Sequence, residues 1–339
     1  MIEFEIVQEN EKGRVGILKA RGIKIETPTF LPVATKACIK TITPEEAKKI
    51  GYDAIIVNAL HIYRRAMNIV GRIGIHNFMK WHGIIFSDSG GFQSIKKFPA
   101  KIVEEGITFK MPNGKEEIFT PKKCMEVQDK IGSDFAFALD DCPSYPYGRK
   151  RVEKSVERTI RWAKDCQGEN RFAIIQGGIY KDLREYCAKK LSKMNFFGFA
   201  IGGLCIGEDR RDMIEIVKFT AKNLPSNRPR HLMGVGSPED ILECVKYGID
   251  IFDSAFPTRN ARHGTIFTSK GKINLGKKKV KGDEIDENCN CYTCRNFSLD
   301  YLNYLFKERE QLAMRLATIH NLYYINDFMK KIRDEIKYK

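Results

Sequence analysis

Eight short apolar runs, separated by stretches with helical spacing, most constrain what this chain of 339 residues can fold into. They cover residues 29–33, 54–57, 84–87, 135–139, 172–175, 198–201, 231–235 and 249–252. Continuous apolar runs of this length are typical of strands buried on both faces of a parallel sheet. Eight such strands alternating with helices predict an α/β fold, the eight-stranded β/α barrel of the TIM type. The competing dinucleotide-binding sheet is disfavoured because no Gly-x-Gly-x-x-Gly motif follows the first run.

The sequence also predicts two additions to the barrel and a separate C-terminal part. Residues 107–110 and 115–119 are β-prone and flank Asn113-Gly114, a pair that favours a hairpin turn. We therefore expect residues 1–265 to form the barrel, with an N-terminal β extension and a hairpin insertion near residues 103–119. Residues 266–339 are expected to contain a basic stretch, a zinc-binding subdomain and the C-terminal helices.

Three cysteines within six residues, followed by a histidine on a helical stretch, indicate a metal site. They are Cys289, Cys291 and Cys294, with His320 as the fourth candidate ligand. Zinc favours this mixture of sulfur and imidazole ligands in a tetrahedral site. A closed site of four protein ligands leaves no position for a substrate, so one structural zinc ion per chain is expected. The other cysteines are expected to be free thiols, and the other histidines, His231 among them, to be structural.

The formal net charge of +15 indicates a polyanionic partner. Much of the excess lies in a lysine-rich stretch just before the cysteines, where it is suited to nucleic-acid phosphates. The alternative is a solvated lysine-rich surface without a partner. The candidate RNA-binding residues are Arg259, Arg262, Lys277, Lys278 and Lys279.

Two features of the sequence bear on localisation. No apolar run approaches the roughly 20 residues of a membrane span. The N-terminal residues, Met1 to Glu5, lack the basic start and apolar core of a secretory signal. We therefore expect a cytoplasmic protein without a membrane partner.

Polar or glycine-rich residues follow the predicted strands, where β/α barrels carry their active sites. Carboxylates that face one pocket can act as nucleophile and general acid/base, or can bind the N–H edge of a purine-like base. Phe92 or Met233 could then cover the faces of that base. For any single aspartate, the alternative is a helix cap. The candidates are Asp88, Phe92, Asp140, Gln176, Gly203, Leu204, Met233 and Asp253.

At these residues the sequence resembles the tRNA-guanine transglycosylase (queuine tRNA-ribosyltransferase) family, in its bacterial form. The resemblance extends from about Gly22 to Tyr324. The matching segments, in order, are Asp88-Ser89-Gly90-Gly91-Phe92-Gln93, Gln176-Gly177-Gly178, Gly202-Gly203-Leu204, Phe252-Asp253 with Pro257-Thr258-Arg259, and Cys-x-Cys-x-x-Cys with His320.

The resemblance implies a base exchange at the wobble guanosine of the tRNA anticodon. Asp253 would be the nucleophile that attacks the ribose, and Asp88 the general acid/base. Asp140 and Gln176 would read the edge of the base, and Phe92 would stack on it. Gly203 and Leu204 would offer backbone groups. The zinc subdomain and the basic stretch would hold the anticodon stem-loop, and a homodimer is expected.

Two departures from the family pattern affect the expected substrate. Asn58-Ala59-Leu60-His61 stands where bacterial relatives usually read Asn-Thr-Tyr-His, which bears on the contacts with ribose and RNA. Ile206 is bulky near the expected 7-substituent and favours 7-aminomethyl-7-deazaguanine over queuine; 7-cyano-7-deazaguanine stays open. Further alternatives are a paralogue acting on DNA or another tRNA position, and a non-catalytic tRNA-binding partner subunit. The presence of both Asp88 and Asp253 argues against the last.

Overall fold

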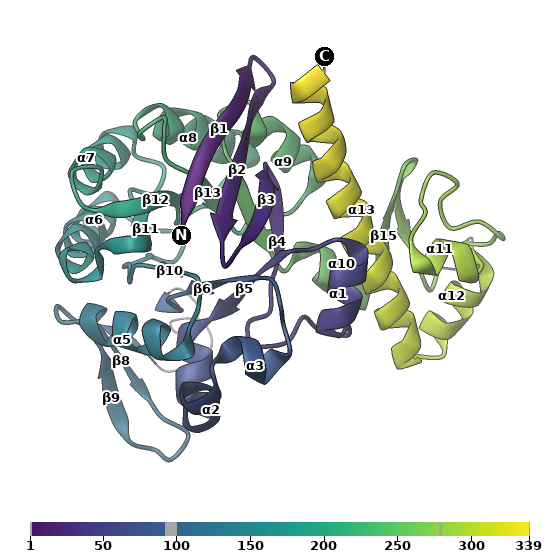
Figure 1. The fold of residues 1–339 in the computed structure, drawn as a ribbon, viewed down its shortest axis with the longest axis horizontal. Helices are drawn as coiled ribbons and strands as arrows, with labels where there is room; N and C mark the ends of the chain where they lie inside the picture. The colour runs from purple at the N-terminus through teal and green to yellow at the C-terminus, as the bar shows by residue number, and fades with distance from the viewer. Residues whose placement is uncertain (1, 92–99, 278–279, 339) are drawn as a thin grey trace.

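Eight parallel strands form a closed ring at the centre of the protein in a computed structural model that describes residues 2–91, 100–277 and 280–338 (Figure 1). Their order is β4-β14-β13-β12-β11-β10-β6-β5, and a parallel bridge between Val33 and Ile56 joins the two ends. The predicted β/α barrel is thus confirmed. The strands are β4 (Thr29–Pro32), β5 (Ala54–Asn58), β6 (Ile84–Asp88), β10 (Phe135–Phe137), β11 (Gly168–Ile175), β12 (Phe196–Ile201), β13 (Arg230–Met233) and β14 (Ile251–Ser254).

Helices cover the outside of the barrel, and capping side chains fix where several of them begin. Thr43 and Glu46 form a reciprocal capping box, while Thr120 and Ser237 each accept a backbone N–H bond from the first turn. The helices are α1 (Pro44–Ile50), α2 (Ala59–Ile73), α3 (Ile75–Met79), α5 (Pro121–Ile131), α6 (Arg149–Ala163), α7 (Lys181–Leu191), α8 (Arg210–Lys222), α9 (Pro238–Val245) and α10 (Phe256–Arg262).

Phenylalanine rings fill the interior of the barrel. Phe86 stacks on Phe135 with ring centroids 4.7 Å apart, and Phe137 lies 5.2 Å from Phe172. Phe172 occupies the space that a side chain at position 198 would need, because a Cβ built on Gly198 would lie 2.4 Å from its ring. The interior is therefore a packed apolar core rather than a channel.

An antiparallel N-terminal sheet closes the end of the barrel where the strands begin. It consists of β1 (Glu3–Asn10), β2 (Gly13–Ala20) and β3 (Ile23–Thr27). Leu18 and Ile25 belong to the same buried cluster as the interior phenylalanines. Arg14 donates a 2.9 Å hydrogen bond to Asp250, which immediately precedes β14. Among the described residues, this sheet leaves the opposite end of the barrel open for a site.

An antiparallel hairpin lies between β6 and α5. β8 (Ile107–Lys110) pairs with β9 (Glu116–Phe119), and the short β7 (Lys101–Ile102) extends the sheet. Buried Phe109 and Phe119 attach the hairpin to the barrel by packing against Tyr63 of α2.

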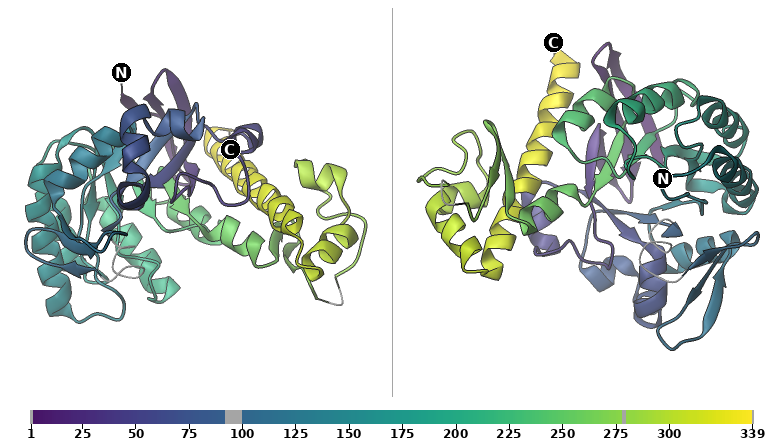
Figure 2. Two further views of the ribbon diagram at one scale, coloured as in Figure 1. Left: turned by 90° about the horizontal axis from the view of Figure 1, so that it is seen from below. Right: turned by 180° about the vertical axis from the view of Figure 1, so that it is seen from behind.

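The C-terminal part has a small core of its own beside the barrel (Figure 2). It contains β15 (Thr265–Thr268), β16 (Gly271–Asn274), α11 (Tyr292–Asn296), α12 (Leu299–Lys307) and α13 (Gln311–Tyr338). Leu316 of α13 packs in this small core, whereas Ile325 and Ile336 of the same helix pack in the main core. We keep the predicted division at residues 265/266 as a proposal. Among the described residues, no helix is long and apolar enough to cross a membrane.

We expect Gly198→Ala to lower the free energy of unfolding by about 1–3 kcal/mol, because the added methyl group overpacks the barrel against Phe172. Urea denaturation would show this as a lower midpoint with an unchanged slope. Gly148→Ser is the control, since φ is −85° there, no described heavy atom lies within 4 Å of the added Cβ, and serine is a favourable N-cap for α6. Equal midpoints for the two variants would contradict this account of the packing.

Candidate active site and metal centre

A cavity of about 350 Å³ opens at the carboxyl ends of the barrel strands. Its volume falls within the range of about 300–1,000 Å³ that is usual for small-molecule sites. The predicted residues that line it are Asp88, Asp140, Gly203, Leu204, Met233, Asp253 and Arg259. The structure thus brings together residues that lie up to 171 positions apart in the sequence, from Asp88 to Arg259. Phe92 lies outside the described residues.

Asp88 ends β6, directly beside Asn58 at the end of β5. The Nδ2 of Asn58 donates a 2.8 Å hydrogen bond to Oδ2 of Asp88, while its Oδ1 caps α2 by accepting the His61 N–H. Burial raises the pKa of Asp88 to about 6, and the negative charge of Asp253 acts in the same direction. A carboxyl group with this pKa can exchange a proton near neutral pH. Asn58 was expected only within a segment that bears on contacts with ribose and RNA, and its place at a strand end was a usable signal for the contact with Asp88.

Asp140 is the second carboxyl group with a raised pKa. Burial raises its pKa to about 7, even though the Nε2 of Gln176 donates a 2.6 Å hydrogen bond that favours the ionised form. Gln176 is fully buried behind Asp140. Its Oε1 has no hydrogen-bond partner among the described residues, so this pair retains hydrogen-bonding capacity for a ligand.

Gly203 permits this arrangement because it has no side chain. A Cβ built there would lie 2.3 Å from Oε1 of Gln176, and its φ of +67° favours glycine. Gly203 and Leu204 both line the cavity.

Asp253 lies on β14 and contacts a histidine on the neighbouring strand. The Nε2 of His231 lies 2.8 Å from Oδ1 of Asp253. The Asp253 side chain is 15% exposed and lines the cavity, whereas the His231 side chain is 0% exposed. From the sequence, His231 was expected to be structural, and its contact with Asp253 was not predicted. A usable signal was its position two residues before Met233, because alternate residues of a strand share one face.

The candidate RNA-binding residues are not all in one place. Arg259 follows Asp253 on α10 and lines the cavity. Arg262, one turn further along α10, donates a 2.8 Å hydrogen bond to the Thr258 carbonyl. Lys277 is exposed after β16 and lies outside the cavity lining. Lys278 and Lys279 fall outside the part of the chain that the structure describes.

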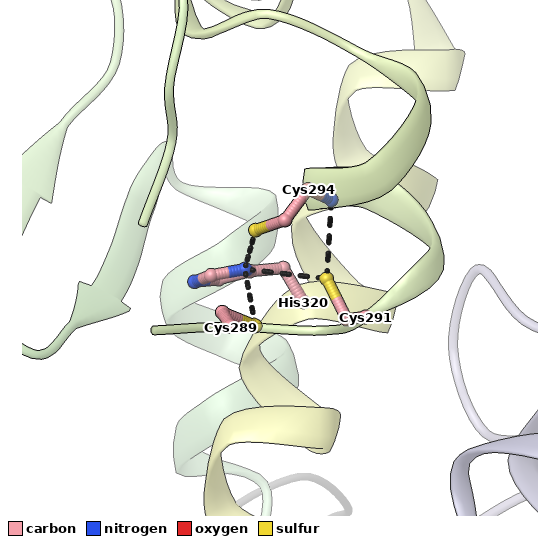
Figure 3. A group of neighbouring side chains, drawn as sticks. All are labelled: Cys289, Cys291, Cys294 and His320. Carbon is pink, nitrogen blue, oxygen red and sulfur yellow. Dashed lines mark hydrogen bonds between the residues drawn. The ribbon is translucent and has the colours of Figure 1, made fainter. Parts of the chain in front are cut away.

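The predicted metal ligands converge as Figure 3 shows. Nδ1 of His320 lies 3.7, 3.5 and 3.2 Å from the Sγ atoms of Cys289, Cys291 and Cys294. A tetrahedral zinc ion with ordinary bond lengths would place nitrogen and sulfur about 3.6 Å apart. Nε2 of His320 lies 2.5 Å from the Phe267 carbonyl, which orients the ring with Nδ1 toward the sulfurs. The four side chains thus fit a metal ion.

Known proteins match this chain along nearly its whole length. The model of the family described as Queuine tRNA-ribosyltransferase matches residues 9–339. The chain is 44% identical to the protein of that name from Thermoanaerobacter sp. (strain X514), covering 99% of this chain and 94% of the relative. Identity is 43% to the one from Francisella tularensis subsp. novicida (strain U112), with 98% and 94% covered. The chain therefore belongs to the queuine tRNA-ribosyltransferase family.

Proposed function

We propose that this protein is a tRNA-guanine transglycosylase, a pentosyltransferase that replaces the wobble guanine of tRNA anticodons with a 7-deazaguanine in queuosine biosynthesis. The observation that carries the proposal is that Asp88 and Asp253 line one cavity of suitable size. The two carboxyl groups are in different surroundings, and that difference suits a division between acid/base and nucleophile. The names of the bacterial relatives support the same reaction.

In the first half of the proposed reaction, the carboxylate of Asp253 attacks the anomeric carbon of the ribose. The bond between that carbon and the guanine nitrogen breaks, and Asp88 gives its proton to the departing nitrogen. The RNA is then held by an ester bond between its ribose and Asp253. In the second half, Asp88 accepts a proton from the incoming base, whose nitrogen displaces Asp253. Atoms and charges balance without an additional reactant.

We assign recognition of the base to the residues around this pair. Asp140 offers hydrogen bonds to the base edge, and the backbone at Gly203 and Leu204 offers more. Gln176 is outside the described cavity lining, so its proposed part in reading the base is to hold the Asp140 carboxyl group by its hydrogen bond. Met233 provides an apolar contact. Stacking by Phe92 stays a prediction.

Ile206 supports a choice among the 7-substituents. Its side chain lines the cavity, on the loop that follows β12. A bulky residue at this place favours the small aminomethyl group over the cyclopentenediol of queuine. We therefore propose 7-aminomethyl-7-deazaguanine, with 7-cyano-7-deazaguanine and queuine as alternatives.

For the metal centre we propose one structural zinc ion per chain. Four protein ligands complete a tetrahedral shell, which suits a structural rather than a catalytic ion. The subdomain that it stabilises, together with Arg259, Arg262 and Lys277, is proposed to contact tRNA phosphates. A second copy of the chain, forming a homodimer, stays a prediction from the family resemblance.

The test of the reaction is incorporation of labelled guanine into an unmodified tRNA that carries a wobble guanosine. We expect incorporation by the unaltered enzyme, and a loss of at least about a thousandfold in Asp253→Asn with tRNA binding retained. A DNA hairpin of the same sequence and a tRNA lacking the wobble guanosine should not be labelled. Competition among the three 7-deazaguanines identifies the preferred base.

Each alternative has its own outcome in this assay. Labelling of the DNA hairpin or of the second tRNA would favour the corresponding paralogue. No labelling by folded, metal-bound protein that binds tRNA would favour the non-catalytic subunit. Full activity of Asp253→Asn would refute the nucleophile assignment.

The pKa of Asp88 predicts how the first half-reaction depends on pH. Asp88 must be protonated to release guanine, and its raised pKa of about 6 means that the protonated form is lost as the pH rises above that value. We expect the single-turnover rate of guanine release to fall by up to about tenfold per pH unit above this value.

Asn58→Ser provides the matched variant, because serine can still cap α2 but lacks the amide that donates to Asp88. That hydrogen bond favours the ionised carboxylate, so its loss should raise the pKa of Asp88. The fall in the rate of guanine release should then begin at a higher pH. If the rate of guanine release fell over the same pH range in Asn58→Ser and in Asp88→Asn as in the unaltered enzyme, the proposed role of Asp88 would be contradicted.

Removing one metal ligand should release the metal and destabilise the C-terminal part. We expect Cys291→Ala to lower bound zinc from about one ion per chain to nearly none, and to lower the unfolding temperature. Elemental analysis and thermal denaturation measure both effects. The control is Cys38→Ala at an exposed cysteine outside the cluster, which should keep its zinc. Full zinc content in Cys291→Ala would exclude Cys291 as a ligand.

A further inference from the structure

We propose that His231 is a positioning residue for the nucleophile: a neutral imidazole that donates its Nε2–H to Oδ1 of Asp253. This hydrogen bond holds the carboxylate so that its other oxygen faces the ribose. The inference rests on the proposed role of Asp253 and adds a residue and a protonation state to it.

The contact follows from the pairing of two neighbouring strands. Met233 of β13 is the register partner of Asp253 on β14, and His231 is two residues earlier on β13. His231 therefore shares a strand face with Met233 and lies diagonally below Asp253, one layer deeper in the barrel. At 2.8 Å, the separation of Nε2 and Oδ1 is that of a good hydrogen bond.

The surroundings of the imidazole determine where its proton lies. Its ring lies edge-on to those of Phe86, Phe137 and Phe172, with centroids 6.4, 4.9 and 6.5 Å away. Nδ1 is buried and has no hydrogen-bond partner among the described residues. A proton on Nδ1 would place an unpaired N–H donor among hydrocarbon rings, which is costly.

Neutral imidazole carries one proton, and an ionised carboxylate can only accept a hydrogen bond. The single proton of His231 therefore belongs on Nε2, between the ring and Asp253. The buried Nδ1 is then an acceptor without a donor among the described residues. With the proton on Nδ1 instead, two acceptors, Nε2 and Oδ1, would lie 2.8 Å apart and repel each other. The contact with Asp253 therefore selects the tautomer with its proton on Nε2.

Positioning rather than catalysis is the role that this location allows. The described lining of the cavity contains Asp253 but not His231, so His231 reaches the substrate only through the carboxylate. The other ionisable side chains that line the cavity with Asp253 are Asp88, Asp140, Cys142, Cys205 and Arg259. His231 differs from all of them because it hydrogen-bonds Asp253 without being among the residues that line the cavity. A carboxylate fixed from below cannot rotate freely, which reduces the orientational cost of attack.

The kinetic test compares two substitutions of similar size. His231→Phe keeps an aromatic ring in the phenylalanine cluster but lacks the donor, whereas the amide of His231→Gln can reach Asp253 as Nε2 does. We expect formation of the covalent RNA–enzyme complex in a single turnover to slow by about 10- to 100-fold in His231→Phe. His231→Gln should stay within about threefold of the unaltered enzyme, and the KM for tRNA should be unchanged in both. Equal rates in the two variants would overturn the proposal.

A second measurement uses the unaltered protein and does not depend on how the variants fold. The chain has six histidines, so selective ¹⁵N labelling gives a tractable spectrum, with the His231 signals assigned from their loss in His231→Gln. We expect a protonated Nε2 and an unprotonated Nδ1 at neutral pH. A proton on Nδ1, alone or together with one on Nε2, would overturn the proposal. Failure of the unaltered enzyme to exchange guanine would instead count against the proposed function, and the spectrum would still decide the hydrogen bond.

Discussion

The phenylalanine packing inside the barrel is the constraint on which the candidate site depends. Side chains alternate along a strand, so residues 86 and 88 of β6 point into the same interior, and so do residues 172, 174 and 176 of β11 and its end. Phe86 lies one layer below Asp88, and Phe172 and Ile174 lie in the layers below Gln176. The polar groups therefore rest on a dry apolar layer. That layer is why burial dominates the raised pKa of Asp88 and Asp140.

The barrel and the positions of its strands could be predicted from the sequence, because buried parallel strands produce short apolar runs between helices. The observed strands overlap all eight expected ranges, with bounds that differ by a few residues. The metal ligands were predictable for a local reason, since three of them lie within six residues. The hairpin was predictable from its turn residues.

Contacts between strands were harder to predict, because they depend on register. Asn58 meets Asp88 because the two are direct register partners on β5 and β6, whereas His231 meets Asp253 across a diagonal between β13 and β14. A shift of either strand by one residue would turn the same side chains outward. For Gln176, the sequence predicts a place at a strand end. Its hydrogen bond to Asp140 was not predicted, because that arrangement depends on the space left by Gly203.

Among the described residues, the filled interior and the sheet that closes its lower end leave the barrel one open end. In the proposed exchange, a base released at the bottom of the site would therefore leave past the same rim by which the next base enters. An RNA lying across that rim would let only one base pass at a time. The proposed bond between ribose and Asp253 would hold the RNA in place during that interval. The closed end of the barrel would then require departure of the first base before arrival of the next.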